Sequence, residues 1–89
     1  MRSVITVVGK DMVGILAKVA ALCAENNANV AEVSQTVLQD MFAMIMMVDI
    51  DKLSCQHTEF ARRLEKLGEE IGLKIHVMHE DIFNSMHRI

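Results

Sequence analysis

Hydrophobic residues recur along this chain with two periods, which predict strands and helices in the order βαββαβ. The strand patterns are runs or alternations of apolar and β-branched residues, over residues 3–8, 29–38, 42–50 and 73–79. The helix patterns repeat apolar residues every three or four positions, over residues 12–24 and 56–71. Residues 80–89 predict one or two further helical turns, with Asp81 as the cap and Ile82, Met86 and Ile89 on one side.

The turns between these segments fix the fold class. Gln39 and Asp40 form a two-residue turn, which makes residues 29–38 and 42–50 a hairpin, and Gly72 is placed to end the second helix. Two crossover units that share a hairpin predict an α+β ferredoxin-like sandwich: a four-stranded antiparallel sheet with two helices on one face. We expect residues 1–80 to form the domain and residues 81–89 a short C-terminal helical extension.

Two of the predicted strands are apolar on both sides. In the first strand, Val4 and Val8 lie opposite Ile5 and Val7. In the third strand we place Met44, Met46 and Val48 on one side, and Ile45, Met47, Phe42 and Ile50 on the other. Because a bare sheet face is normally polar, we expect it to be covered, either by the C-terminal segment or by another subunit in a two-fold contact.

Composition and charge narrow the possible partners. The 89 residues suffice for one domain, and 52% of them are apolar but only 3% aromatic, so eight methionines must fill much of the core. The net charge of -3 argues against nucleic acid and anionic membranes as partners. The longest apolar run, residues 41–48, is too short to span a bilayer.

The candidate reactive side chains do not form a catalytic or metal-binding pattern. Cys23 lies on the inner stripe of the first helix, and Cys55 has no paired base nearby in the sequence. Without a secretory leader, the cysteines indicate a reducing, cytoplasmic location. His76 and His79 are three apart on a strand and point to opposite faces. We therefore expect no enzyme activity, no cofactor and no metal.

The loop from Gly9 to Gly14 is the main candidate site. Its glycine spacing suggests a phosphate-binding loop, but no Lys-Ser/Thr step and no third glycine follow, and Asp11 would repel a phosphate. The loop has no cysteine for a soft metal ion. An RNA-recognition domain of this topology would need stacking aromatics, and the central strands offer only Phe42.

The same residues resemble a known family. The pattern Gly9-x-Asp11-x-x-Gly14-Ile15-Leu16, with a helix that ends in residues 25–30 (ENNANV), is similar to the signature of ACT domains, which are small ligand-binding regulatory modules of amino-acid biosynthesis. The resemblance covers residues 1 to about 80. It is closest in form to stand-alone bacterial ACT proteins and to the ACT portions of the glycine-cleavage repressor and formyltetrahydrofolate deformylase.

The resemblance implies a homodimer, or a higher even oligomer, that binds an amino acid or similar effector where the loop after the first strand faces a partner subunit. The implied ligand-binding residues are Gly9, Lys10, Asp11, Met12, Val13, Gly14 and Asn29. Two of them depart from the family pattern. Val13 replaces a common proline, and the carboxylate of Asp11 replaces the amide of serine-binding members, so the identity of the ligand does not carry over.

Each of these residues also has a purely structural interpretation. Asp11 can act as the N-cap of the first helix, Gly14 can serve tight packing of that helix on the sheet, and Asn29 can be a turn residue. Two other functions stay open. One is a ligand-free interaction module that docks through its sheet edge and C-terminal tail, and the other is a small enzyme or redox sensor that uses Cys55.

Overall fold

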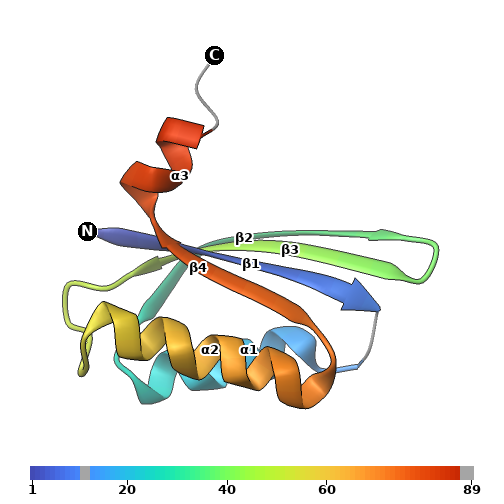
Figure 1. Ribbon diagram of the computed structural model, residues 1–89, viewed down its shortest axis with the longest axis horizontal. Helices are drawn as coiled ribbons and strands as arrows, with labels where there is room; N and C mark the ends of the chain where they lie inside the picture. The colour runs from blue at the N-terminus through green and yellow to red at the C-terminus, as the bar shows by residue number, and fades with distance from the viewer. Residues whose placement is uncertain (11–12, 87–89) are drawn as a thin grey trace.

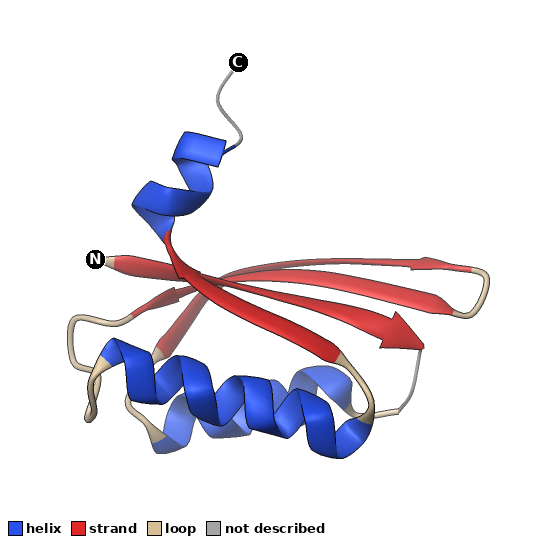
Figure 2. Cartoon of the chain, in the orientation of Figure 1, coloured by secondary structure: helices blue, strands red, loops and turns tan. Residues whose placement is uncertain are grey.

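The computed structural model describes residues 1–10 and 13–86, and it confirms the predicted βαββαβ order (Figures 1 and 2). The strands are β1 (Arg2–Lys10), β2 (Asn29–Leu38), β3 (Met41–Asp49) and β4 (Lys74–His79). The helices are α1 (Ile15–Glu25), α2 (His57–Ile71) and α3 (Glu80–Met86). The largest difference from the sequence prediction is at the first helix, which begins at Ile15 rather than Met12.

The strands of the described chain form one antiparallel sheet in the order β2-β3-β1-β4. β1 lies inside the sheet, where Val8 is level with Ala43 of β3 and Lys74 of β4. β2 and β4 are the edges, and β2 has a register shift between Val30 and Glu32. α1 and α2 cover one face, whereas α3 projects from the other (Figure 1).

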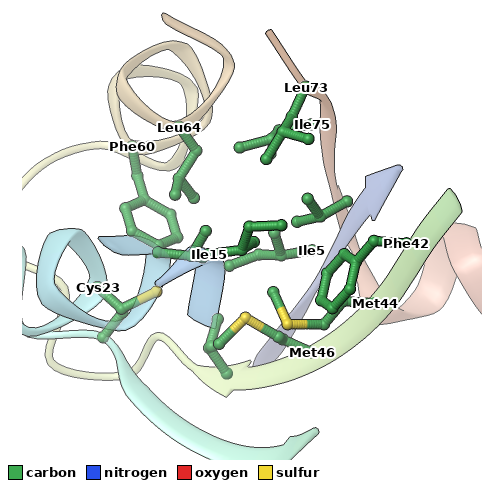
Figure 3. Close-up of a cluster of buried hydrophobic side chains, with 14 residues drawn as sticks. Ile5, Ile15, Cys23, Phe42, Met44, Met46, Phe60, Leu64, Leu73 and Ile75 are labelled. Atoms are coloured by element: carbon green, nitrogen blue, oxygen red, sulfur yellow. The ribbon is translucent and has the colours of Figure 1, made fainter. Parts of the chain in front are cut away.

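The core lies between the sheet and the two longer helices (Figure 3). α2 contributes Phe60 and Leu64, which are fully buried against sheet residues such as Ile5. Burial of one such side chain contributes about 1.5–3 kcal/mol. The sheet side is rich in methionine, and Met44 and Met46 of β3 lie between the helices and the sheet backbone. The unbranched thioether side chains fill the space that larger rings would otherwise occupy.

The predicted sides of Phe42 and Ile50 are wrong. Phe42 is buried beside Met44 in the core (Figure 3). Ile50 packs against the same cluster. The reason is the two-residue period of a strand, which places Phe42 and also Ile50, the residue after the end of β3, on the same face as Met44. The face away from α1 and α2 therefore has fewer large apolar side chains than the sequence predicts.

The contacts of α2 show why it ends and packs where it does. Its outer face holds Glu59, which bonds both Arg62 and Arg63, at i,i+3 and i,i+4 spacing. Gly72 ends the helix with φ 77°, a left-handed conformation that favours glycine.

Among the described residues, no helix is both long and apolar enough to cross a membrane.

The sheet face opposite α1 and α2 is covered at one end only. Val4 is fully buried there, whereas Val8, four residues along the same strand, is 43% exposed. α3 packs on β1 and β4 at the buried end, and Glu80 at its first position bonds the Arg2 guanidinium through both carboxylate oxygens. Because α3 begins at Glu80, Asp81 lies in its first turn and is not its cap. The predicted position of Ile89 lies outside the described residues.

Candidate functional site

Gly14 begins α1 with a left-handed backbone. It is the N-cap residue with φ 84° and ψ 13°, and its carbonyl oxygen accepts the first helical hydrogen bond, from the Lys18 amide at 3.0 Å. A Cβ added at Gly14 would meet no atom within 4 Å, so tight packing on the sheet does not explain this glycine. Its role is conformational, because a left-handed residue costs little only as glycine.

The first turn of α1 lies beside a hollow on the protein surface. No described side chain caps the helix, and its first turn has no acidic residue. The amides of Ile15, Leu16 and Ala17 have no acceptor within the helix. The hollow has a volume of ≈ 450 Å³. It is lined by Gly14, Ile15, Leu16, Ala17, Gln35, Val37 and Phe42. We call it the Gly14 hollow, and its amides suit an anionic group such as a carboxylate.

The other predicted loop residues take different positions. Gly9 lies on β1 against Leu73, and its missing Cβ makes room for that side chain. Lys10 ends β1 opposite Met41 and shares the sheet face of Val8, away from α1. Val13 is almost fully exposed. Asp11 and Met12, and with them the predicted capping by Asp11, lie outside the described residues.

Asn29 lies at the opposite end of α1. It is the first residue of β2, and it lines a second hollow of ≈ 550 Å³. The other lining residues are Ala24, Asn27, Ala28, Asp49, Asp51 and Lys52. An 11-residue helix is about 16 Å long. Within one chain, Gly14 and Asn29 therefore do not share a hollow. We call the second one the Asn29 hollow.

Three charged residues of the Asn29 hollow were not among the predicted site residues, namely Asp49, Asp51 and Lys52. They offer both signs of charge, which suits a ligand with an ammonium and a carboxylate group. The sequence carried no direct signal for Asp49. Counting back from the two-residue turn after β2 places Ile50 level with Asn29, and the register shift between Val30 and Glu32 brings Asp49 to that position instead.

Asn26 holds the elements around the Asn29 hollow together. It is almost fully buried, and its side-chain amide donates to the Leu22 carbonyl oxygen at 2.8 Å. Its Oδ1 accepts from the Arg63 guanidinium and, at 3.6 Å, from the Cys55 thiol. Its backbone carbonyl accepts from the Ser54 amide at 2.9 Å. Asn26 was not among the predicted site residues, although it joins α1, α2 and the segment between β3 and α2.

A histidine and serine pair lies on the helix side of the sheet near the end of β4. Ser3 Oγ is 2.9 Å from His57 Nε2 and donates its only hydrogen to the Met78 carbonyl oxygen at 3.0 Å. His57 Nε2 must therefore carry the hydrogen of their shared bond. The His79 ring lies 4.4 Å from that of His57. Because Ser3 is fully buried and accepts from the imidazole, the pair is not a nucleophile and its base.

Burial shifts the pKa of His57 and of the core cysteine Cys23. It lowers the pKa of His57, with a further contribution from the charge of His79. Burial raises the pKa of the Cys23 thiol to about 11, so this core cysteine stays protonated at neutral pH. Among residues 1–10 and 13–86, no cluster of three or more His, Cys, Asp or Glu side chains has the geometry to hold a metal ion.

Comparison with known proteins identifies the family of this chain. A family model of the ACT domain matches residues 2–78. A UPF0237 protein of Methanococcus maripaludis is 55% identical over 97% of this chain and 96% of its own length. A solved ACT domain protein from Streptococcus pneumoniae is 37% identical, with a TM-score of 0.81 and 93% of each chain covered.

The fold also occurs in larger regulatory proteins. The regulatory subunit of aspartate kinase from Thermus thermophilus is 28% identical, with a TM-score of 0.67, over 85% of this chain and 49% of that subunit. The family match, the identity to the UPF0237 protein and the βαββαβ fold agree with the resemblance seen in the loop and first helix. The chain belongs to the ACT domain family.

Proposed function

We propose that this protein is a regulatory module that binds an amino acid, or a related small metabolite, between two copies of the chain. ACT domains are ligand-binding regulatory modules, and one structural neighbour is a regulatory subunit of an enzyme that acts on aspartate. The observation that carries the proposal is the division of the predicted site. Gly14 and Asn29 line separate hollows at opposite ends of α1, so one chain supplies half of a site at each end.

The edge strand β2 offers a way to join the two halves. It is ten residues long, is exposed along most of its length and carries a single charge, Glu32. Natural proteins rarely leave such an edge free. Antiparallel pairing of two β2 strands about a two-fold axis would bring the end of one strand beside the start of the other. The Gly14 hollow of one copy, which Gln35 and Val37 line, would then meet the Asn29 hollow of the other.

The groups at such a junction match an α-amino acid. Backbone amides at the start of α1 suit the carboxylate, and the carboxylates of Asp49, Asp51 and, as the resemblance implies, Asp11 suit the ammonium group. The Asn29 amide can bond either group. The side chain of the ligand would lie toward the apolar wall that Phe42 and Val37 form. No step of this binding requires a covalent or redox reaction, so we assign the protein no catalytic activity.

Isothermal titration calorimetry with each of the twenty amino acids tests the proposal. We expect binding of at least one amino acid at millimolar concentration or below. Asn29→Ala should weaken that binding at least tenfold, whereas Asn84→Ala, on the exposed side of α3, should leave it unchanged. Absence of heat with all twenty amino acids would argue strongly against this function.

Subunit mixing tests whether the site spans two copies. Asp11→Ala and Asn29→Ala should each abolish binding when the variants are alone, with Asp40→Ala in the exposed turn as a control. A site shared between copies takes Asp11 from one chain and Asn29 from the other, so a heterodimer of the two variants has one intact site. Mixed variants should therefore regain binding at up to one ligand per heterodimer. A site within one chain would remain inactive after mixing.

A ligand-free interaction module is the alternative, and the same exposed β2 edge favours it. The edge would then pair with a strand of another protein. Under this alternative, Asp11→Ala would change only stability. The alternative would be supported if Asp11→Ala self-associates as the wild-type protein does and no amino acid gives heat in calorimetry.

A further inference from the structure

We propose that the sheet face opposite α1 and α2 binds a second copy of this chain through α3, at an interface separate from the β2 edge. The apolar side chains of this face form a continuous patch. Val8 is level with Ala43 of β3, and Ile45 and Met41 flank Ala43 on the same strand. Val8, Ile45 and Met41 are 43%, 44% and 46% exposed. We call these residues the open patch.

α3 carries the apolar side chains that match the open patch. Ile82 and Met86 are one helical turn apart and are 54% and 66% exposed. The helix is fixed at its base by the Arg2–Glu80 ion pair and projects on the same side of the sheet as the open patch (Figure 1). It covers only the end of the face near Val4. A single copy therefore exposes two complementary apolar surfaces on one side of its sheet.

The two-fold geometry allows each copy to cover the other. When two sheets pack face to face, a two-fold axis across the strands places the α3 of each copy over the end that the partner's own α3 leaves bare. That end holds Val8. An axis along the strands would instead place α3 over β2 and β3 at the end where Glu32 lies level with Met47.

Charge selects the first of these arrangements. Lys10 and Lys74 lie beside the open patch and share its face, since Lys10 is level with Met41 and Lys74 with Val8. α3 is acidic at its start, where Asp81 is exposed and Glu80 already bonds Arg2. The axis across the strands brings Asp81 toward the two lysines, whereas the axis along the strands brings it toward Glu32. Opposite charges therefore favour contact of α3 with Val8, Lys10 and Lys74 of the second copy.

A charge exchange tests this interface by sedimentation over a range of protein concentrations. Asp81→Lys and Lys74→Asp should each weaken self-association at least tenfold, and the double variant should recover most of the loss. The exposed pair Glu69→Lys and Lys66→Asp on α2 is the control and should have no effect. If the single variants associate as the wild type does, or if the double variant shows no recovery, the proposed contact is wrong.

Cross-linking tests the contact independently of charge. In a Cys55→Ser background, Ile82→Cys and Val8→Cys chains are prepared separately, mixed and oxidised. We expect a covalent dimer between the two different chains. Ile82→Cys mixed with Lys66→Cys, on the far side of the sheet, should give none above the background of random collisions. Equal yields from both mixtures would overturn the proposal, and neither result depends on whether the protein binds an amino acid.

Discussion

A few buried polar side chains determine how the elements of this protein are held together. Asn26 and His57 both lie where segments distant in the sequence meet, and each makes hydrogen bonds that only one arrangement of the chain permits. A polar side chain without a partner in the interior is costly. These residues therefore stabilise the fold by completing the hydrogen bonds of buried polar groups around them. Replacing either residue leaves those groups without a hydrogen-bond partner.

Asn26→Ala should lower the free energy of unfolding by about 1–3 kcal/mol, because it removes the side-chain hydrogen-bond partner of the Leu22 carbonyl, the Arg63 guanidinium and the Cys55 thiol. Urea denaturation followed by circular dichroism measures this. The exposed substitution Asn84→Ala should change stability by less than about 0.5 kcal/mol. An equal effect of the two substitutions would show that the Asn26 bonds contribute nothing net.

The lowered pKa of His57 predicts a loss of stability in mild acid. Its ordinary pKa is about 6.5, and burial and the charge of His79 hold the folded-state pKa below that value. Above this pH the imidazole is neutral in both states. As the pH falls below about 6.5, the unfolded chain binds a proton that the folded protein resists, so stability falls until the folded pKa is reached.

Melting temperatures between pH 7.5 and 5 measure this dependence. His57→Gln keeps a donor for Ser3 but cannot titrate, and it should reduce the fall in melting temperature. His76→Gln, on the opposite face of β4, is the matched control and should keep the wild-type slope. Identical slopes for the wild type and His57→Gln would show that other groups cause the acid sensitivity.

At the scale of the elements, packing contacts determine how closely a helix can approach the sheet. α2 approaches β4 closely at Gly68, where a Cβ would lie 2.8 Å from the Leu73 carbonyl oxygen and 2.9 Å from Ile75 Cγ1. The Leu73 amide also bonds the Gly68 carbonyl at 2.8 Å, which joins the end of α2 to the start of β4. Gly68 therefore serves close contact, whereas Gly14 and Gly72 serve backbone conformation.

Gly68→Ala should destabilise the protein by about 1–3 kcal/mol through overpacking. Alanine is the better helix former by roughly 1 kcal/mol, so propensity alone predicts the opposite sign. Thermal unfolding distinguishes the two. Glu69→Ala, at the next and exposed position, isolates the propensity term and should be neutral or slightly stabilising. A stabilised Gly68→Ala protein would mean that α2 can move away from β4 at little cost.

The elements themselves were largely predictable from the sequence, because hydrophobic period and turn residues act locally. β2 and its turn at Gln39 and Asp40 have the predicted bounds. The start of α1 was misplaced because the left-handed backbone of Gly14 delays the helix, and glycine alone does not reveal its φ. The side of Phe42 was wrong although strand parity contained the answer.

The candidate site was predictable only in part. The loop at Gly14 and the position of Asn29 carry local signals, but the distance between them depends on the direction of α1 and on the sheet order. The same applies to the approach of His57 to His79, which belong to different elements. A register shift within β2, which no local pattern revealed, places Asp49 level with Asn29.

At the scale of the whole molecule, the proposed function requires association and binding to be linked. If each site takes the Gly14 hollow from one copy and the Asn29 hollow from another, a ligand that binds only the dimer must stabilise the dimer. Conversely, the apparent affinity for the ligand must fall when dilution separates the copies. A site contained in a single chain would show neither dependence.

Measurements of the dimer dissociation constant therefore test the linkage directly. With the amino acid that calorimetry identifies present at 100 times its Kd, two equivalent sites should lower the dimer dissociation constant by up to about four orders of magnitude, since each contributes about 2.7 kcal/mol. Val37→Glu on the exposed β2 edge should weaken dimerisation and ligand binding together. Glu70→Gln on α2 is the control and should affect neither. Ligand affinity that is constant across protein concentrations spanning dissociation would show that one chain binds the effector alone, and the shared site would then have to be abandoned.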